Sequence, residues 1–350
     1  MSKKTVVIAI SGGIDSAVAS HLLKKQGYNV IAVHAVCYNK DVPFCTAQRD
    51  REDAIKIASY LEIPLKIIDL TKEYEELVID NMVHEYEIGL TPNPDVFCNR
   101  YVKFDLIYNY CKDNLKFDYF ATGHYSKISS NMLLQSPKDI NKDQTYFLWD
   151  IDKKIFDKLL FPLGDIMKPE VRATAERIAL PNKNKPDSQG LCFIGNVKIE
   201  DFLSQYLPEK KGIVTDDKGK LLGEHKGHYF YTVGQRHGFT IFDYSPEPYF
   251  IIKKDADKNI LVVGCKEDLY KDLLVSQLSY FYDEHLTNKT YARIRNLGEL
   301  TEVSIFETDI KDEYVIKTID ESKKFYAPAK GQSLVLYNDH YEVIGGGVIL

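Results

Sequence analysis

Hydrophobic residues in the first part of the chain fall into short apolar runs that alternate with segments of helical character. A short apolar run bounded by polar residues is typical of a buried strand. The pattern predicts strands over residues 5–10, 29–36, 65–70 and 117–122, and helices over 17–26, 49–61, 74–86 and 101–114. Strands separated by helices form parallel α/β sheets, which bind ligands at the carboxyl ends of their strands. We therefore expect a parallel α/β domain whose function resides in those loops.

Residues beyond about 200 show a different pattern. A polar segment at 210–220 precedes the sequence HYFYTVGQRHG, and after about residue 267 the chain shows short alternating runs at 291–294, 303–306, 314–319 and 333–337. Alternating runs at close spacing are typical of a small β-barrel. We expect three domains: an α/β domain over 1–200, a small central domain over 201–266 and a C-terminal β-barrel over 267–350.

Charge and cysteine content narrow the function. Lys and Arg number 45 against 51 Asp and Glu among 350 residues, a net charge of −6. This excludes a generally basic surface for nucleic acid, so any polyanion must meet local basic patches. No apolar stretch approaches the ~18 residues of a membrane span, and the amino terminus resembles neither a signal peptide nor a transit peptide. The six cysteines form no CxxC pair, which predicts a cytoplasmic protein with reduced thiols. Cys37, Cys111 and Cys265 are expected to be buried apolar residues.

A glycine-rich turn follows the first predicted strand, with the sequence Ser11-Gly12-Gly13-Ile14-Asp15-Ser16. Glycines allow the backbone to approach an anion closely, and N–H groups at a helix start, with the serine hydroxyls, can hold a pyrophosphate. No Gly-Lys-Ser/Thr follows, so this is not a Walker A loop. SGGxDS resembles the PP-loop of ATP pyrophosphatases, which transfer AMP from ATP to an oxygen. The resemblance implies ATP and Mg²⁺ as cofactors, with Asp15 assisting the metal; the alternative is an ordinary β–α turn.

Two cysteines stand in distinctive segments. Cys98 ends the proline-stiffened TPNPDVFC before the helix predicted from residue 101, where helix-terminal amides should favour its thiolate. Asp95 precedes it by three residues and could act as a base. Cys192 lies much later, in DSQGLCFIG. Each cysteine alone could equally be a buried apolar residue.

Together these segments carry a closer resemblance. SGGIDS, TPNPDVFCN, ATGHY, NKDQTYFL, FPLGD with KPEVR, and DSQGLCFIG occur in this order, followed by YTVGQRHG and GQS. The chain resembles the tRNA-specific 2-thiouridylases of the MnmA type over nearly its whole length. The resemblance implies an adenine-nucleotide alpha-hydrolase-like domain, a tRNA-binding central domain and a barrel. It also implies conversion of the wobble uridine of tRNA to 2-thiouridine by a sulfurtransferase that is supplied by a sulfur-carrier protein or persulfide donor.

The same resemblance assigns site residues. Cys192 would carry a persulfide, Cys98 would attack it and end in a disulfide with Cys192, and Asp95 would act as general acid/base. ATP would bind at Ala9, Ile10, Ser11, Gly12, Gly13, Ile14, Asp15, Ser16, Ala35 and Gly123. The uridine and the rest of the tRNA would contact Asn93, Pro94, Asp95, His124, Lys142, Asp143 and Gln144, and, from the barrel, Arg293, Ile294, Arg295 and Gln332. The alternative for Arg293 and Arg295 is a solvated strand face.

Several alternatives stay open. No cysteine or histidine group has zinc spacing, but an iron–sulfur cluster held by Cys98, Cys192 and Asp95 would also suit sulfur transfer. Another PP-loop enzyme that transfers nitrogen, or a non-catalytic tRNA-binding protein with a degenerate nucleotide pocket, would not need the paired cysteines. We expect a monomer with no membrane partner.

Overall fold

The structure is a computed structural model that describes residues 3–40, 42–43, 45–187, 190–243, 246–320 and 322–350. The chain divides into two compact units. The first unit comprises residues up to 79, 94–197 and 340–343, and the second comprises 80–93, 198–339 and 344–350. The three-domain division expected from the sequence stays a prediction.

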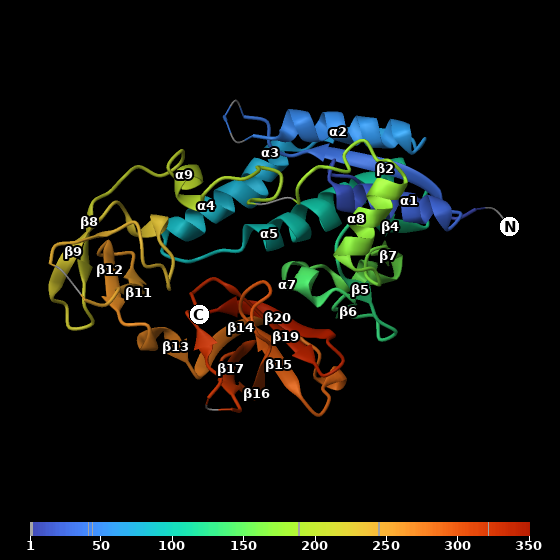
Figure 1. The fold of residues 1–350 in the computed structure, drawn as a ribbon. Helices are drawn as coiled ribbons and strands as arrows, with labels where there is room; N and C mark the ends of the chain where they lie inside the picture. The colour runs from blue at the N-terminus through green and yellow to red at the C-terminus, as the bar shows by residue number, and fades with distance from the viewer. Residues whose placement is uncertain (1–2, 41, 44, 188–189, 244–245, 321) are drawn as a thin grey trace. The chain divides into compact units, whose positions relative to one another are not determined.

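A parallel five-stranded sheet organises the first unit, in the order β3-β2-β1-β4-β7. Its strands β2, β4 and β7 are labelled in Figure 1. Its strands are β1 (Thr5–Ala9), β2 (Asn29–Val36), β3 (Leu65–Asp69), β4 (Tyr119–Ala121) and β7 (Leu159–Leu160). All neighbouring pairs in this sheet are parallel, which confirms the predicted α/β class. The chain passes to β2 on one side of β1 and to β4 on the other. Such a reversal of strand order opens a crevice at the carboxyl ends of the strands.

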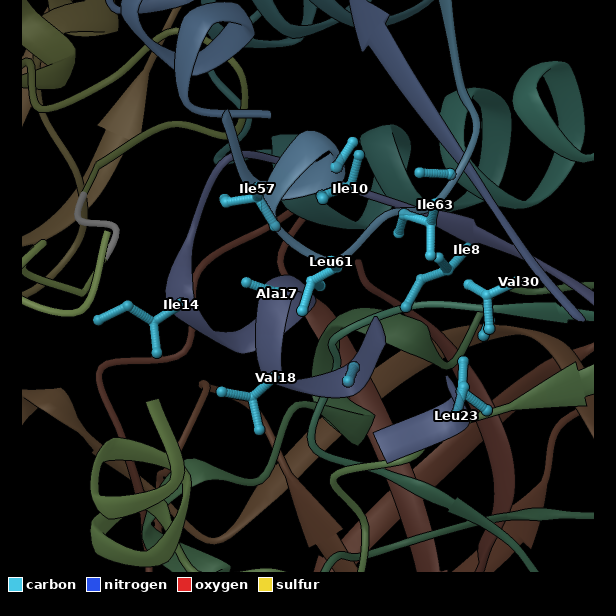
Figure 2. Packing of buried hydrophobic residues seen from close by; sticks show 14 of the residues in the cluster. Ile8, Ile10, Ile14, Ala17, Val18, Leu23, Val30, Ile57, Leu61 and Ile63 are labelled. Carbon is cyan, nitrogen blue, oxygen red and sulfur yellow. The ribbon is translucent and has the colours of Figure 1, made fainter. Parts of the chain in front are cut away.

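Helices α1 (Ile14–Lys25), α2 (Ala47–Tyr60) and α8 (Lys168–Arg177) complete the core of this unit. Ile8 of β1, Leu23 of α1 and Ile57 of α2 belong to one buried cluster (Figure 2). Burying each such side chain contributes roughly 1.5–3 kcal/mol. This packing fixes the start of α1, and with it the glycine-rich turn, against the sheet.

Two helical segments differ from the sequence prediction. Residues 71–87 form α3 (Thr71–Tyr74), a π-helical stretch η1 (Glu75–Ile79) and α4 (Asp80–Glu87). The second segment forms α5 (Pro94–Phe97), the π-helical η2 (Cys98–Ile107) and α6 (Tyr108–Asn114). The helix therefore begins at Pro94 rather than at residue 101, because proline is favoured in the first turn, where its missing N–H needs no partner. Cys98 thus lies within the helical segment.

The remaining elements of the first unit are short: β5 (Lys127–Ile128), β6 (Leu134–Gln135) and α7 (Thr145–Leu148). No helix among the described residues is both long enough and apolar enough to cross a membrane.

The second unit contains a mixed sheet and a closed barrel. The sheet has the order β10-β9-β8-β12-β11, formed by β8 (Gly212–Thr215), β9 (Leu221–His225), β10 (Thr240–Ile241), β11 (Phe250–Asp255) and β12 (Ile260–Gly264). The barrel has the order β14-β17-β16-β15-β19-β20, with β14 (Leu273–Phe281), β15 (Thr290–Arg293), β16 (Thr301–Glu307), β17 (Glu313–Thr318), β19 (Ser333–Asn338) and β20 (Val343–Ile349). This confirms the predicted β-barrel. Helix α9 (Ile199–Leu203) and the strand pair β13 (Tyr270–Lys271) and β18 (Phe325–Tyr326) complete the unit.

Candidate functional site

The glycine-rich turn forms a cradle of donors at the carboxyl end of β1. Ser16 Oγ accepts from the N–H of Ser11 at 3.2 Å, and the N–H of Gly13 donates to Ser11 Oγ at 3.3 Å. Gly12 has φ +77°, and a Cβ there would lie 2.5 Å from the carbonyl oxygen of Asp50. Only glycine fits this conformation and this space. The turn therefore depends on glycine at position 12, and it places N–H groups and hydroxyls at the start of α1.

The other residues expected to bind ATP lie along the same edge of the sheet. Ala9 ends β1, and Ala35 lies near the end of β2, where it is 5% exposed. Gly123 follows β4, and a Cβ there would come within 2.7 Å of the backbone nitrogen of Ser16. The structure thus brings these three positions and the turn to one edge, as the sequence predicted. Their contact with a nucleotide remains a prediction.

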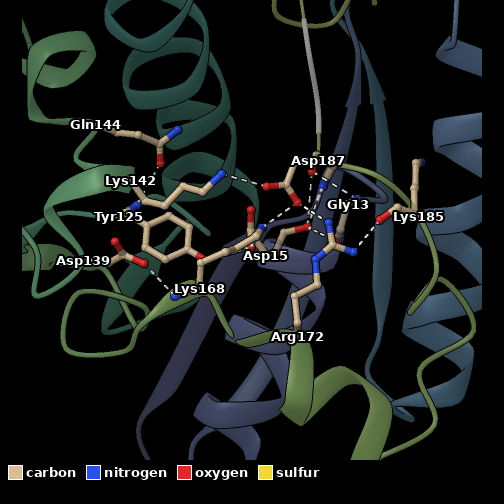
Figure 3. A network of polar contacts seen from close by, with 12 residues as sticks. Gly13, Asp15, Tyr125, Asp139, Lys142, Gln144, Lys168, Arg172, Lys185 and Asp187 are labelled. Atoms are coloured by element: carbon tan, nitrogen blue, oxygen red, sulfur yellow. Dashed lines mark hydrogen bonds and ion pairs between the residues drawn. The ribbon is translucent and has the colours of Figure 1, made fainter. Parts of the chain in front are cut away.

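A network of ion pairs surrounds the turn (Figure 3). Asp15 Oδ1 accepts from Lys168 Nζ at 2.6 Å and from the hydroxyl of Tyr125 at 3.0 Å. Asp187 pairs with three cations: Lys168 at 2.9 Å, Lys142 at 2.8 Å and Arg172. Burial opposes ionisation of Asp187, but the hydrogen bonds from Lys142 and Lys168 outweigh it and hold its pKa well below the usual range. Cations are thus concentrated beside a loop of anion-binding geometry.

A second basic contact closes the other side of the turn. Lys185 Nζ lies 2.7 Å from Asp50 Oδ1, 2.6 Å from Asp53 Oδ2 and 3.3 Å from the carbonyl oxygen of Gly12. Asn182 Nδ2 donates to the same carbonyl oxygen at 3.0 Å. These bonds fix the carbonyl group of Gly12, and with it the conformation of the turn.

The two cysteines singled out in the sequence meet in the first unit. Cys98 Sγ lies 3.3 Å from Cys192 Sγ, although 94 residues separate them along the chain. Cys98 is fully buried at the start of η2. Cys192 lies in a tight turn in which the N–H of Leu191 donates to the carbonyl oxygen of Gly195 at 3.1 Å. The hydroxyl of Tyr74 fixes this turn by donating to the carbonyl oxygen of Cys192 at 2.6 Å.

The electrostatics of the pair differ from the sequence prediction. Burial raises the pKa of Cys98 well above its usual value, so the expectation that helix-terminal amides favour its thiolate is wrong. The hydrogen bond from Cys98, together with the nearby ammonium of Lys103, instead lowers the pKa of Cys192 to about 7. Cys192 is therefore the thiol of the pair that ionises first, with Cys98 as the donor to it. Asp95 lies beside them, accepts from the N–H of Cys192, and has its pKa raised by burial.

His124 lies beside Lys103, and both of its ring nitrogens have hydrogen-bond partners. Its Nδ1 is 2.8 Å from Thr122 Oγ1 and its Nε2 is 3.4 Å from Lys103 Nζ. An ammonium can only donate, so Nε2 accepts and the ring proton resides on Nδ1. Burial and Lys103 lower the pKa of His124 well below its usual value, consistent with a neutral ring. The tRNA contact expected of His124 stays a prediction.

Lys142, Asp143 and Gln144 lie at three different places in the polar network. Lys142 pairs with Asp187 beside the glycine-rich turn. Asp143 is buried and accepts from Ser136 and from the N–H and hydroxyl of Thr145. Gln144 Oε1 accepts from the N–H of Tyr125 at 2.9 Å. The carboxylate of Asp143 therefore organises its own loop, and the expected contacts of all three with tRNA stay predictions.

The expected tRNA residues of the barrel lie in the second unit. Arg293 is 7% exposed and its guanidinium lies 5.2 Å from the ring centre of Tyr337, so the alternative of a solvated strand face is wrong for this residue. Ile294 is also buried. Arg295 donates to the carbonyl oxygen of Ala327 at 2.8 Å.

Several further residues have straightforward placements. Gln332 is half-buried in the loop before β19. Asn93 and Pro94 mark the point where the chain passes from the second unit to the first. Cys37 and Cys111 are buried as expected. The expectation of burial is wrong for Cys265, which is exposed and whose thiol lies 3.0 Å from Asp268 Oδ2.

Three site residues received no role from the sequence. Lys168 lies in KPEVR and Asp187 begins DSQGLCFIG, so both stood in segments that the resemblance had marked. Lys103 follows Cys98 by five positions in the same helical segment. The i→i+5 repeat of a π-helix places such residues near one another, but no pattern in the sequence announced that geometry.

The donor groups around the two cysteines bear on metal binding. The two sulfurs are hydrogen-bonded to each other, and among the described residues no three His, Cys, Asp or Glu side chains are placed to hold one ion. Cys98, Cys192 and Asp95 therefore do not fit a cluster as they are arranged, and we derive no step through one. Asp15 does fit Mg²⁺, which usually takes one or two carboxylates and completes its shell with phosphate oxygens and water.

The first unit has a parallel sheet, a glycine-rich turn where the strand order reverses, and two thiols that lie together. These features define the class of protein as a nucleotide-binding α/β protein with a thiol site. Three family models match in succession. They are described as the tRNA methyl transferase HUP domain at residues 4–196, the tRNA methyl transferase PRC-barrel domain at 200–265 and the aminomethyltransferase beta-barrel domain at 270–349.

Curated relatives specify the family. The chain is 39% identical to the tRNA-specific 2-thiouridylase MnmA of Lactiplantibacillus plantarum, over 99% of this chain and 96% of that protein. It is 38% identical to the protein of the same name from Malacoplasma penetrans, over 99% and 98%, and 37% identical to that of Colwellia psychrerythraea, over 98% and 95%. The chain belongs to the tRNA-specific 2-thiouridylase (MnmA) family.

Solved structures resemble the chain more distantly. The U34-tRNA thiolase NcsA from Methanococcus maripaludis, with its [4Fe-4S] cluster, is 22% identical, with a TM-score of 0.38, over 59% of this chain and 68% of that chain.

Proposed function

We propose that the protein is an ATP-dependent tRNA uridine 2-sulfurtransferase that converts the wobble uridine of tRNA to 2-thiouridine. The observation that carries the proposal is the approach of Cys98 Sγ to Cys192 Sγ, at 3.3 Å, in the unit that also forms the glycine-rich turn. Membership of the family supplies the substrate class. Neither a nitrogen-transferring enzyme nor a passive tRNA-binding protein needs this pair of thiols.

The first step activates the uridine. The N–H groups and hydroxyls of residues 11–16 would hold the phosphates of ATP, with Lys168 and Lys142 close enough to exchange Asp187 for phosphate oxygens. Asp15 would bind Mg²⁺, which neutralises phosphate charge. The uridine O2 attacks the α-phosphorus, the bond to the β-phosphate oxygen breaks, and pyrophosphate leaves. The O2 atom then departs in the next step as part of AMP, which is a much better leaving group.

The second step transfers sulfur. The terminal sulfur of a persulfide on Cys192 attacks C2, and the C2–O2 bond breaks to release AMP. Cys98 then loses its proton and attacks Cys192 Sγ, which breaks the bond between Cys192 and the transferred sulfur. This leaves 2-thiouridine and a Cys98–Cys192 disulfide, which a thiol reductant reopens. In the alternative order, Cys98 attacks first and releases hydrosulfide as the nucleophile. Asp95, whose pKa is raised by burial, is the group suited to exchange protons with the base.

The chemistry also requires an extruded base. The O2 atom of a stacked uridine is out of reach, so the anticodon loop must present its wobble base unstacked. We assign Asn93, Pro94 and Asp95 to the uridine, and His124, Lys142, Asp143 and Gln144 to the surrounding tRNA. Arg293, Ile294, Arg295 and Gln332 are assigned to tRNA contacts from the second unit. The sulfur donor is a persulfide-carrying protein, and the working state is a monomer.

The test is mass spectrometry of anticodon nucleosides after incubation with ATP, Mg²⁺, a persulfide donor and unmodified tRNA. Replacement of oxygen by sulfur at the wobble uridine supports the proposal. Addition of a methyl group, as the family descriptions would suggest, gives a different mass and would overturn it.

The Cys192→Ala variant separates activation from sulfur transfer. It should still release pyrophosphate when tRNA is present, but should form no 2-thiouridine. The exposed Cys265 provides a matched control, because Cys265→Ala should thiolate normally. Formation of 2-thiouridine by Cys192→Ala at the wild-type rate would instead show that Cys192 does not carry the sulfur.

A further inference from the structure

Lys103 occupies a position that no step above has used. It lies on η2, half-buried, with its ammonium group beside the thiol pair. Its Nζ is 2.9 Å from Asn99 Oδ1 and 3.4 Å from His124 Nε2, and it also hydrogen-bonds to Cys192. A cation held out of bulk water needs such partners, because isolated burial of a charge is strongly unfavourable.

The hydrogen bonds around Lys103 leave little freedom. An ammonium group has three protons and no lone pair, and the three acceptors are Asn99, His124 and Cys192. Asn99 is itself fixed, because its Nδ2 donates to the carbonyl oxygen of Phe147 at 2.9 Å. Two of the three bonds therefore aim the ammonium group, and the third points at the sulfur.

The sulfur of Cys192 accepts from two sides. Cys98 Sγ donates to it and so does Lys103. A group that accepts two hydrogen bonds, one of them from a cation, is stabilised as an anion. The other titratable groups that face the two cysteines are Asp95, Cys37 and Tyr74. None of these three carries positive charge, so Lys103 supplies the positive charge among these described neighbours.

We propose that Lys103 is a catalytic residue of sulfur transfer: its ammonium group binds the sulfur on Cys192 and holds it as an anion during loading and during attack on the uridine. The inference rests on the proposed function. It adds to that function the group that makes Cys192, rather than Cys98, the sulfur-carrying residue.

The loading step shows what the ammonium group does. The Cys192 thiolate attacks the outer sulfur of the donor's persulfide, and a new S–S bond forms. The donor's own S–S bond breaks, its inner sulfur leaves as a thiolate, and the proton of the donor's persulfide passes to that thiolate. Cys192 then carries an anionic persulfide that still faces Lys103. The negative charge is on Cys192 Sγ before the step and on the outer sulfur of its persulfide afterwards, so the same cation can stabilise both states.

The test follows the rate at which iodoacetamide alkylates Cys192 as pH is varied, with the modified peptide located by mass spectrometry. In the wild type the rate should rise with an inflection near pH 7. In Lys103→Met the inflection should move up by about one unit or more, so that alkylation at pH 7 slows at least about fivefold. Lys103→Arg keeps the charge, so its inflection should lie close to that of the wild type. The control is Lys112→Met, an exposed lysine of α6, which should leave the inflection unchanged. An unchanged inflection in Lys103→Met overturns the proposal.

A reciprocal measurement keeps the proposal testable if Lys103→Met fails to fold. In Cys192→Ser the pKa of Lys103, followed by its acetylation with acetic anhydride across pH, should fall relative to the wild type, because coupling between two sites acts equally on both. An unaltered Lys103 profile overturns the proposal. Neither measurement uses ATP or tRNA, so the Lys103–Cys192 pair is tested separately from tRNA thiolation.

Discussion

Replacing Gly123 by alanine should weaken nucleotide binding, because the added methyl group would press against the backbone of the glycine-rich turn. The added Cβ would lie 2.7 Å from the backbone nitrogen of Ser16 and 2.9 Å from the carbonyl carbon of Asp15, whereas ordinary contact begins at 3.4 Å. Both neighbours are backbone atoms, so the strand end or the start of α1 must move by several tenths of an ångström. Overpacking of this kind costs about 1–3 kcal/mol. The displaced N–H groups should weaken ATP binding at least about tenfold, which corresponds to ~1.4 kcal/mol.

Calorimetric titration with ATP and Mg²⁺ measures the affinity, and thermal unfolding measures the stability of the same variant. Gly27→Ala is the matched control, because Gly27 has φ +90° with no atom within 4 Å of a built Cβ. It should lose about 1 kcal/mol of stability through left-handed strain and keep its ATP affinity. A Gly123→Ala protein that binds ATP as the wild type does would refute the placement of the nucleotide beside Gly123.

Three further outcomes are expected. Asp187→Asn leaves Lys142, Lys168 and Arg172 without their shared carboxylate and should lower the free energy of unfolding by about 1–2 kcal/mol at pH 7, a modest value because these groups are partly exposed. The stabilisation by Asp187 is complete above about pH 4 and is lost as pH falls through its lowered pKa. In urea unfolding, the difference in the free energy of unfolding between Asp187→Asn and the wild type should therefore shrink below pH 4. A difference that stays constant with pH would contradict the ion pairing. The rate at which Cys192 is loaded with persulfide should rise with pH, with an inflection near pH 7, and level off above about pH 8. A rise that continues unchanged to pH 9 in a stopped-flow measurement would place the reacting thiolate elsewhere.

The fold of the first unit could be predicted because its signals are local. The strand expected at 29–36 is β2 as observed, and the glycine-rich turn lies between strand and helix as its residues require. The last barrel strand, β20, was missed because its glycines disfavour a strand. The structure explains those glycines, since a Cβ on Gly347 would lie 1.9 Å from the carbonyl oxygen of Gln277 on β14.

The candidate site was only partly readable. The resemblance selected Cys98 and Cys192, but which of the two is the anion depends on the geometry around Lys103, a lysine that looks like any other on a helix. Local sequence favoured the thiolate of Cys98, because position near a helix start was the only signal available. Burial reversed that expectation, and burial of one side chain is decided by the packing of segments far apart in the chain.

The distance along the chain between Cys98 and Cys192 has a thermodynamic consequence for the proposed reaction cycle. A covalent link between residues 94 positions apart removes much of the conformational freedom of the unfolded chain, by about 4–5 kcal/mol in the loop-closure treatment. Each round of sulfur transfer would therefore leave the enzyme in an oxidised form that melts at a higher temperature than the reduced one. The stability gained in that form must be overcome by the cellular reductant, which makes regeneration of the free thiols, rather than the chemistry on the base, the step most sensitive to redox conditions.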